Sequence, residues 1–474
     1  MEITIHTVFK PLPCGNGTFA AKRVEWSEPD RSRRIGSAGT GKRGGQGGMA
    51  IAVLWAIVWL CAALTLPATT VFAESLSECQ HEVSEYHTPV AGEPCNPQVF
   101  GQAINILGRD RDQSSALVLG GTLFTPPLAG EQFLPMGAFY LKHRWDDTRL
   151  RAIFSIFVNE ADVSQTTGHF QLLGHLDNNT IPFPTAEIAG GQEVKRTSII
   201  WGAVNGRVGA GLRLPVAPFQ ADNDLRVQLF YQGGYLYSKR VDDTGRSVVL
   251  PPDTLVHGPL LRVRYDGLLR NLLELPHRGM AAGMDAEFMR RDSWSDANYG
   301  GAVYKRDDTR DYLKVSGYLT AATGVPGLSE RDRLLFSFYG GFAPYGSLDR
   351  FSAYRIGGGP FPSETDDLYR QVYPGAMFNQ FPASDYLIGS AEYRRELLFF
   401  LYLHLRGTYA WVNRDIFTAR RLKFLDDRGE AYSAAITSGF LWDSELYLEY
   451  SYDTRILRNG VSGSTITVLW SKGF

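Results

Sequence analysis

Apolar and polar side chains alternate along most of the chain from about residue 114 to its end. In the clearest segment, 445–453, one face is apolar and the other is acidic: Leu446, Leu448, Tyr450 and Tyr452 alternate with Glu445, Tyr447, Glu449, Ser451 and Asp453. Successive side chains of a β-strand point to opposite faces of the sheet. The pattern therefore predicts strands with one apolar face and one wet face, and it recurs in 150–159, 224–232, 260–266 and 279–291.

Sixteen strands are predicted on this basis. Their expected ranges are 114–124, 135–145, 149–158, 168–177, 196–204, 206–215, 224–238, 258–267, 279–291, 311–322, 332–343, 385–397, 400–412, 431–441, 445–454 and 464–474. An even number of tilted strands, each about 9–11 residues long, is typical of a transmembrane antiparallel β-barrel. The expected fold class is therefore all-β, and the stretch 160–215 is its most ambiguous part.

A soluble β-sandwich would show the same alternation, so the two folds must be separated by other features. Charged residues recur on the polar face of most predicted strands, and a dry sandwich core would not tolerate them without partners. The mean hydropathy is −0.17, yet the chain holds 23 Tyr, 27 Phe and 50 Gly. A wet lumen and an aromatic girdle account for both features. A helical membrane protein is not expected, because only one long apolar stretch occurs.

That apolar stretch, 49–73, predicts a secretory signal peptide with cleavage after Ala73. A transmembrane anchor is the alternative reading, although the apolar core is short and is interrupted by Pro67. Residues 1–48 indicate either a start codon assigned too early or a long basic n-region. The expected organisation is thus a leader (1–73), a short periplasmic segment (74–110) and an outer-membrane β-barrel (111–474).

Charge and cysteine content add little specific chemistry. The chain has a net charge of −2, and removing residues 1–48, which carry four net positive charges, leaves −6. Nothing in this balance indicates a nucleic-acid partner. Cys79 and Cys95 are expected to form a disulfide in an oxidising periplasm. Free thiols, or a metal site shared with His81 and His87, remain alternatives.

The last predicted strand, 464–474, ends the chain on an aromatic residue. Ile466, Val468, Trp470, Lys472 and Phe474 share one face. A terminal Phe474 on an amphipathic strand, with Trp470 on the same face, resembles the β-signal that the barrel assembly machinery recognises. The expected localisation is therefore the bacterial outer membrane, with its lipid and that machinery as partners.

Motifs between residues 276 and 474 resemble the barrel domain of the bacterial surface antigen superfamily, the BamA/TamA-type outer-membrane proteins. These motifs are Pro276-His277-Arg278-Gly279, Arg355-Ile356-Gly357-Gly358-Gly359, Tyr373-Pro374-Gly375, Asn379-Gln380-Phe381 and Ala391-Glu392-Tyr393-Arg394. The resemblance implies a sixteen-stranded barrel whose long sixth extracellular loop folds into the lumen. It also implies client outer-membrane proteins, or a periplasmic accessory protein, as partners.

Two departures from that family pattern affect what is expected. The family's loop-tip Arg pairs with an Asp on the next strand, but Pro374 stands at the Arg position and 400–413 contains no carboxylate. Losing both partners leaves no buried charge unpaired. Arg370, or lumen charges such as Glu392 and Arg394, are expected to hold the loop instead. Because only residues 74–110 precede the barrel, a barrel-only member without POTRA domains is expected.

No catalytic constellation is found, so the sequence predicts neither an enzyme nor a cofactor or metal site. Glu392 and Arg394 are interpreted as structural or selectivity charges of the lumen. Two functions remain open. One is a barrel that inserts or translocates other polypeptides through a seam between its first and last strands. The other is a passive or substrate-selective pore whose charged lumen sets its selectivity.

Overall fold

The computed structural model describes one β-rich unit. It covers residues 88–474 except for 100–101, 129–130, 156–157, 187, 190–191, 194–195, 296, 300–301, 305–308, 359–367, 378–379, 419–420, 440–443 and 459. Within these described residues, no helix is long and apolar enough to cross a membrane. The predicted leader, 1–73, and Cys79 lie outside the described residues.

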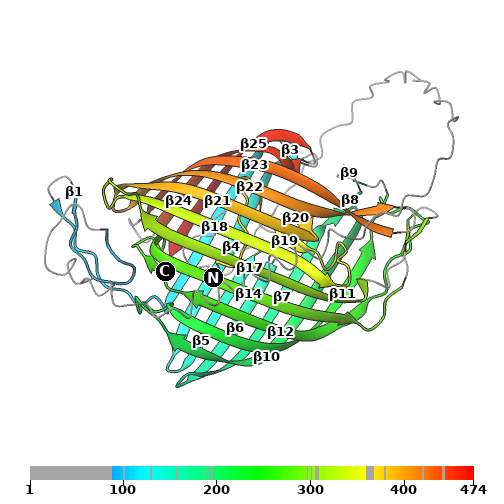
Figure 1. Ribbon diagram of the computed structural model, residues 1–474, viewed down its shortest axis with the longest axis horizontal. Helices are drawn as coiled ribbons and strands as arrows, with labels where there is room; N and C mark the ends of the chain where they lie inside the picture. Colours follow the sequence, from blue (N-terminus) through cyan, green and yellow to red (C-terminus); the bar gives the residue numbers. More distant parts are fainter. Residues whose placement is uncertain are drawn as a thin grey trace, which may run out of the picture. The chain divides into compact units, whose positions relative to one another are not determined.

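Sixteen long strands form a closed antiparallel barrel (Figure 1). They are β3 (Ser114–Leu128), β4 (Glu131–Trp145), β5 (Thr148–Ser155), β6 (Val158–Thr167), β7 (Phe170–Thr185), β10 (Ile199–Pro215), β11 (Asp224–Arg240), β12 (Thr254–Asp266), β14 (Pro276–Arg291), β17 (Asp311–Gly324), β18 (Asp332–Tyr345), β21 (Asp385–Leu398), β22 (Leu401–Thr418), β23 (Arg421–Gly439), β24 (Ser444–Arg458) and β25 (Val461–Gly473). The predicted fold class is confirmed.

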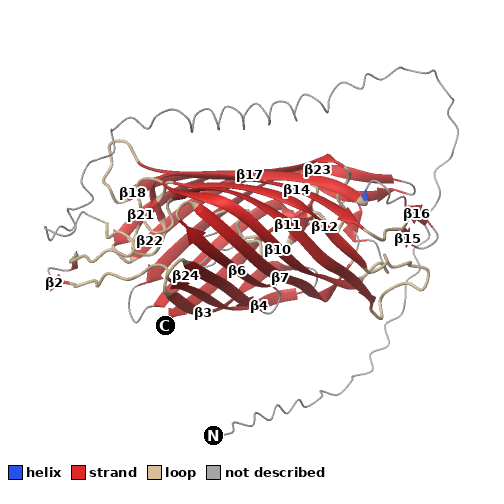
Figure 2. Cartoon of the chain, turned by 90° about the horizontal axis from the view of Figure 1, so that it is seen from below, coloured by secondary structure: helices blue, strands red, loops and turns tan. Residues whose placement is uncertain are grey.

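Short strands lie before β3 and in the connections between the long strands. They are β1 (Gln98–Val99), β2 (Gln102–Ala103), β8 (Ile188–Ala189), β9 (Gln192–Glu193), β13 (Leu269–Arg270), β15 (Ala297–Tyr299), β16 (Ala302–Tyr304), β19 (Tyr354–Ile356) and β20 (Phe381–Ala383). We call the end of the barrel where β3 begins and β25 finishes the near end, and the other the far end. The strands run obliquely between these ends (Figure 2).

The predicted strand map is wrong between residues 160 and 215, although the total is right. β10 is one strand that passes through Asn205-Gly206, where two strands with a turn were predicted. An Asn-Gly pair favours a hairpin turn, but here it pairs in register with Gly233 and Gly234 of β11. β6 was missed because Glu160 and Asp162, which pair with Arg151, give it a weakly apolar pattern.

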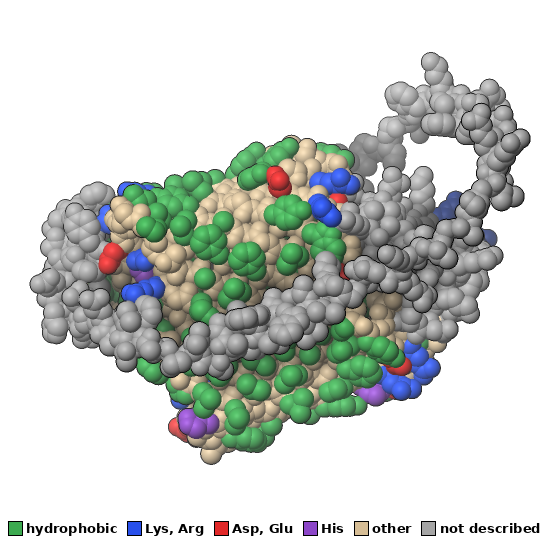
Figure 3. Space-filling view, in the orientation of Figure 1, with side chains coloured by type: hydrophobic (Ala, Val, Ile, Leu, Met, Phe, Trp, Pro, Cys, Tyr) green, Lys and Arg blue, Asp and Glu red, His purple; other side chains and the backbone are tan. Residues whose placement is uncertain are grey.

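The outer wall is apolar, as the alternation predicts. Leu446, Leu448, Tyr450 and Tyr452 of β24 are exposed, whereas Tyr447, Glu449, Ser451 and Asp453 are buried inside. Figure 3 shows apolar side chains spread over the wall and charged ones gathered toward the two ends. In lipid every backbone N–H and C=O must be paired internally, and a closed barrel achieves this. The molecule is therefore built to span a bilayer.

Residues 88–112 form an N-terminal hairpin that projects from the near end (Figure 1). Its arms pair at β1–β2 and at Cys95–Ile106, and Cys95 is buried and disulfide-bonded. Because Cys79 is not described, its pairing with Cys95 stays a prediction. The base of the hairpin bonds to the near-end turn, residues 267–275 between β12 and β14. Ala91 N donates to Arg270 O at 3.0 Å, and Leu272 N donates to Pro89 O at 2.9 Å.

Candidate functional site in the barrel lumen

The long loop, residues 346–384 between β18 and β21, carries most of the motif residues found in the sequence. β19 and β20 pair within it, so that Arg355 faces Pro382. Tyr373 N donates to Gly357 O at 2.7 Å, and a Cβ on Gly358 would lie 2.3 Å from Tyr373 O. The two motif segments, 355–358 and 373–375, are thus brought together, and glycine at 358 is what allows the close approach.

The loop tip, residues 373–375, is attached to the inner wall of β24. The Tyr373 side chain is fully buried, and its hydroxyl donates to Asp453 Oδ1 at 2.5 Å. Gly375 N donates to Glu449 Oε1 at 3.2 Å, and Gly375 has a φ of +75°. A Cβ at Gly375 would lie 2.4 Å from Ser451 Oγ. The tip therefore lies directly against the last two strands of the barrel.

Contacts on other strands hold the residues just before the tip. Arg370 Nη2 pairs with Glu160 Oε1 of β6 at 2.7 Å. The Tyr369 hydroxyl bonds to Ser316 of β17, and the Arg264 guanidinium lies 4.4 Å from the Tyr369 ring centre. Because β6, β17 and β24 lie on different sides of the barrel, the loop crosses the lumen.

These contacts refine the expectation drawn from the missing family ion pair. Arg370 does form an ion pair, but its partner Glu160 is on β6. The acceptors for the tip, Asp453 and Glu449, are on β24, three strands beyond β21, which follows the loop. The sequence had shown their acidic row on the inward face, but it could not show which segment would lie against it. Pro374 itself lies between the two residues that make the tip contacts.

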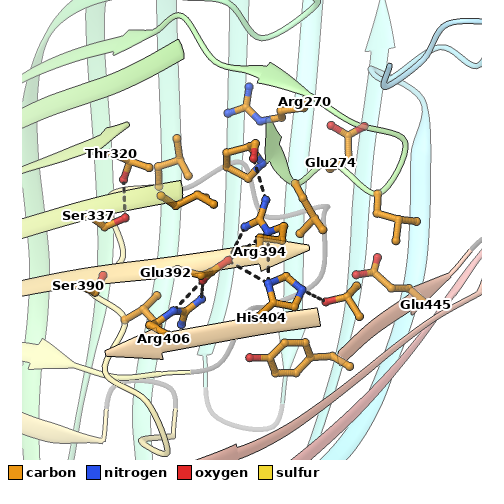
Figure 4. Close-up of a pocket in the computed structure, with 18 of the residues that line it drawn as sticks. Arg270, Glu274, Thr320, Ser337, Ser390, Glu392, Arg394, His404, Arg406 and Glu445 are labelled. Carbon is orange, nitrogen blue, oxygen red and sulfur yellow. Dashed lines mark hydrogen bonds and ion pairs between the residues drawn. The ribbon is translucent and has the colours of Figure 1, made fainter. Parts of the chain in front are cut away.

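A second cluster surrounds Glu392, further toward the near end (Figure 4). Arg394 Nη2 donates to Glu392 Oε1 at 2.8 Å, and Arg406 Nε donates to Oε2 at 2.9 Å. His404 Nδ1 lies 3.0 Å from Oε1, and His404 Nε2 lies 2.9 Å from Thr437 Oγ1. His404 is only 5% exposed, so it is buried among these partners.

This cluster lines a cavity of about 220 Å³ between the long loop and the near-end turn. Arg394 Nη1 also donates to Pro276 O at 2.7 Å, which fixes the start of β14. Glu392 binds Arg394 on its own strand and His404 and Arg406 on β22, and none of these residues lies in the long loop. Glu392 and Arg394 therefore brace the barrel wall. Among the described residues, no group of three or more His, Cys, Asp or Glu could hold a metal ion.

Ion pairs join the base of the N-terminal hairpin to the near-end turns. Arg111 pairs with Glu274, and its Nη2 lies 3.3 Å from Asp222 Oδ2. Burial alone would raise the pKa of Asp222, but the charges of Lys142, Arg149 and Arg111 hold it well below the usual value. Burial opposes the charge of Arg111, whereas Glu274 and Asp222 raise its pKa. The near end is thus held by ionised groups.

The barrel closes where β25 meets β3, and we call this junction the seam. It runs over ten residue pairs, from Ser464–Thr125 to Gly473–Ala116. Thr122 Oγ1 and Thr467 Oγ1 lie 3.2 Å apart inside the barrel. At the far end, Arg458 of β24 donates to Ser464 O at 2.7 Å and to Pro126 O at 3.3 Å, so it spans both seam strands.

The predicted β-signal residues lie at this seam. Trp470 points outward and is paired with Leu119 of β3. Phe474 is 75% exposed, and its backbone N donates to Ser115 O at 2.9 Å. Ile466 and Val468 share the outer face of β25, as predicted.

The chain is similar to BamA and CdiB barrels. BamA from Haemophilus ducreyi lacking POTRA domains 1–3 is 10% identical, with a TM-score of 0.44, over 84% of this chain and 77% of that one. CdiB from Acinetobacter baumannii is 9% identical, with a TM-score of 0.47, over 78% and 61%. CdiB from Escherichia coli is 12% identical, with a TM-score of 0.47, over 81% and 68%.

No protein-family model and no curated protein matches the chain. The first structure bears the name of the family that the sequence motifs resemble. At these identities and TM-scores, the similarity carries no argument about function.

Proposed function

We propose that the chain is an outer-membrane barrel that inserts or translocates other polypeptides at its seam. The observation that carries this proposal is the attachment of the long loop to β24 through Tyr373–Asp453 and Gly375–Glu449. The loop tip also lies against β25, since a Cβ at Gly375 would be 3.1 Å from Thr465 Oγ1. An element inside the lumen is thereby coupled to the strands that close the barrel.

The seam offers the chemistry that such a function needs. Its two strands are held by backbone pairing, and separating them would expose rows of N–H and C=O groups that can template an incoming strand. Gly120 and Gly121 of β3 present no side chain there, and a Cβ on Gly120 would lie 2.1 Å from Val468 O. Fewer side-chain contacts therefore resist separation at this point than along a strand of larger residues.

A solute pore is the second candidate, and the charged lumen favours it. The ion pairs around Glu392 and Asp222 would set the selectivity of such a pore. Against it, the long loop crosses the lumen and the near-end turn reaches β23, where a Cβ on Gly439 would lie 2.7 Å from Leu273 Cδ2. A wide, steady conductance is therefore not expected of the protein in this state.

Locking the seam tests the first proposal. Thr122 and Thr467 are directly opposite each other on the two seam strands. The Cα atoms of such partners lie about 4.5–5.5 Å apart, which a disulfide can span. A Thr122→Cys, Thr467→Cys double variant should therefore form a disulfide. The matched control is Thr320→Cys with Ser337→Cys on β17 and β18. That pair is also directly opposite, and its hydroxyl oxygens are likewise 3.2 Å apart inside the barrel.

The oxidised seam variant should lower the amounts of other outer-membrane or exported proteins, and a reductant should restore them. The oxidised control should behave as the unmodified protein does. If the locked seam leaves all such proteins unchanged, the proposal fails. An ohmic, ion-selective current in a planar bilayer that survives the seam lock would establish the pore instead.

A further inference from the structure

A second cavity, of about 150 Å³, lies in the lumen between β5, β12 and the strands that separate them. Its described lining is dominated by guanidinium groups, with two carboxylates: Arg149, Arg151, Arg213, Arg226, Arg262 and Arg264 face it together with Asp162 and Asp266. The arginine side chains keep between 10% and 29% of their surface exposed. They are therefore accessible to a solute in the lumen.

Carboxylates outside the lining hold four of these arginines in shared pairs. Arg213 Nε and Arg226 Nε lie 2.7 and 2.6 Å from the two oxygens of Asp224. On the adjacent strand β12, Arg262 and Arg264 both bind Asp285, at 3.3 and 2.7 Å. Four guanidinium charges are thus balanced by two carboxylates. The lining itself carries six arginines against two carboxylates.

The two lining carboxylates are already engaged with other groups. Asp162 binds Arg151 at 2.9 Å and His175 Nδ1 at 2.6 Å. Asp266 binds Arg270, which is not part of the lining. Asp162 also interacts with Arg262 of β12, so its charge is shared among several cations.

We propose that this cavity binds a small multivalent oxyanion of the phosphate class. The planar guanidinium fork matches the oxygen geometry of phosphate, and several such forks from neighbouring strands favour a dianion. Arg149 of the lining binds Asp222, in the turn between β10 and β11, at 2.7 Å. On its loop side, Arg264 stacks on Tyr369. A bound anion would therefore stabilise the wall beneath the long loop.

The test is isothermal titration calorimetry of the full-length protein in detergent with inorganic phosphate, and separately with glycerol 3-phosphate. Arg213→Gln and Arg262→Gln are the informative variants, because each leaves the shared carboxylate one guanidinium partner. Each is expected to weaken phosphate binding about tenfold or more, as loss of a charge-assisted hydrogen bond does. Arg207→Gln is the control: it is also on β10 and paired with Asp177, but it is not part of the lining.

Folding is checked for each variant by its heat-modifiable mobility on a gel. Saturable phosphate binding that Arg213→Gln and Arg262→Gln weaken and Arg207→Gln retains would support the site. Tighter binding of glycerol 3-phosphate than of phosphate would identify an organic phosphate as the ligand. No saturable binding of either probe at physiological salt, or equal binding in all variants, would overturn the proposal. This result is independent of the seam experiment, which uses no phosphate.

Discussion

The Tyr373 hydroxyl is the most informative atom of the loop attachment, and Tyr373→Phe removes it alone. The aromatic ring stays, so its edge-to-face contact with Phe381, at a centroid distance of 6.0 Å, is retained. The substitution therefore separates the hydrogen bond to Asp453 from the packing of the ring. If the tip contact holds the loop against β24, the loop should leave this position more often in the variant.

The free energy lost with the Tyr373 hydrogen bond depends on the donors that Asp453 retains. Its oxygens also accept the backbone N–H groups of Ile456, at 3.1 Å, and Leu457, at 3.0 Å. Since the carboxylate retains two donors, the loss lies at the lower end of the range for hydrogen bonds to charged groups, about 1.5 kcal/mol. An energy of that size corresponds to about a tenfold increase in the undocked population.

Cysteine labelling measures that population. Ala376 is 3% exposed beside the tip, so Ala376→Cys should react with a maleimide only when the loop undocks. Peptide mass spectrometry then gives the labelling rate at this position alone. Tyr373→Phe should raise the labelling rate about tenfold. The control is Tyr402→Phe, which should not change the rate: Tyr402 is a buried tyrosine at the start of β22, and its hydroxyl donates to Phe399 O at 3.0 Å. An unchanged rate in Tyr373→Phe, or an equal rise in both, would refute the reasoning.

The loop tip, the Glu392 cluster, the hairpin base and the C-terminus each lead to one further prediction. Gly375→Ala, at φ +75°, should cost about 1–2 kcal/mol and increase labelling in the same assay. Glu392→Gln should lower the free energy of unfolding in urea by about 3–5 kcal/mol, because it leaves buried cations uncompensated, whereas exposed Glu430→Gln should change it by less than about 0.5 kcal/mol. The pKa of Asp222 is held well below its ordinary value of about 4, so its ion pairs stabilise the hairpin base fully above that ordinary value and progressively less as the pH falls from it toward the depressed pKa. Hydrogen exchange of residues 102–113, corrected for intrinsic rates, should accelerate only in that acidic range. Deleting Phe474, which is exposed, should leave the melting temperature of the refolded barrel within a few degrees but lower its yield in the outer membrane.

The alternation of side chains carried enough information to predict the barrel, because one face of each strand meets lipid. It failed where that signal is weak. β6 offers few apolar outward residues, so its inward carboxylates resembled a polar connection. In β10 the local preference of Asn205-Gly206 for a turn was overridden by pairing with β7 and β11 on both sides.

The lumen was predictable in composition but not in pairing. The acidic row of β24 and the motif 373–375 were both visible in the sequence, yet only the closed barrel brings Tyr373 to Asp453. The arginine-lined cavity shows the same limit. Arg151, Arg226, Arg262 and Arg264 lie on the polar faces of three predicted strands, 149–158, 224–238 and 258–267. Their convergence depends on how many strands separate them around the wall. Single-strand patterns do not contain that information.

Both edges of the seam are tethered to the inside of the molecule. β3 continues into the hairpin base, which is anchored at Glu274 on the opposite side of the barrel, and β24 beside β25 is anchored to the loop tip. The first tether consists of ion pairs that open to acid, and the second is a neutral hydroxyl on a carboxylate. In the proposed opening of the seam, β24 and β25 would move outward together only after release of the loop tip, whereas β3 would stay fixed at the hairpin base. β25 would then be the mobile strand of the seam and β3 the fixed one.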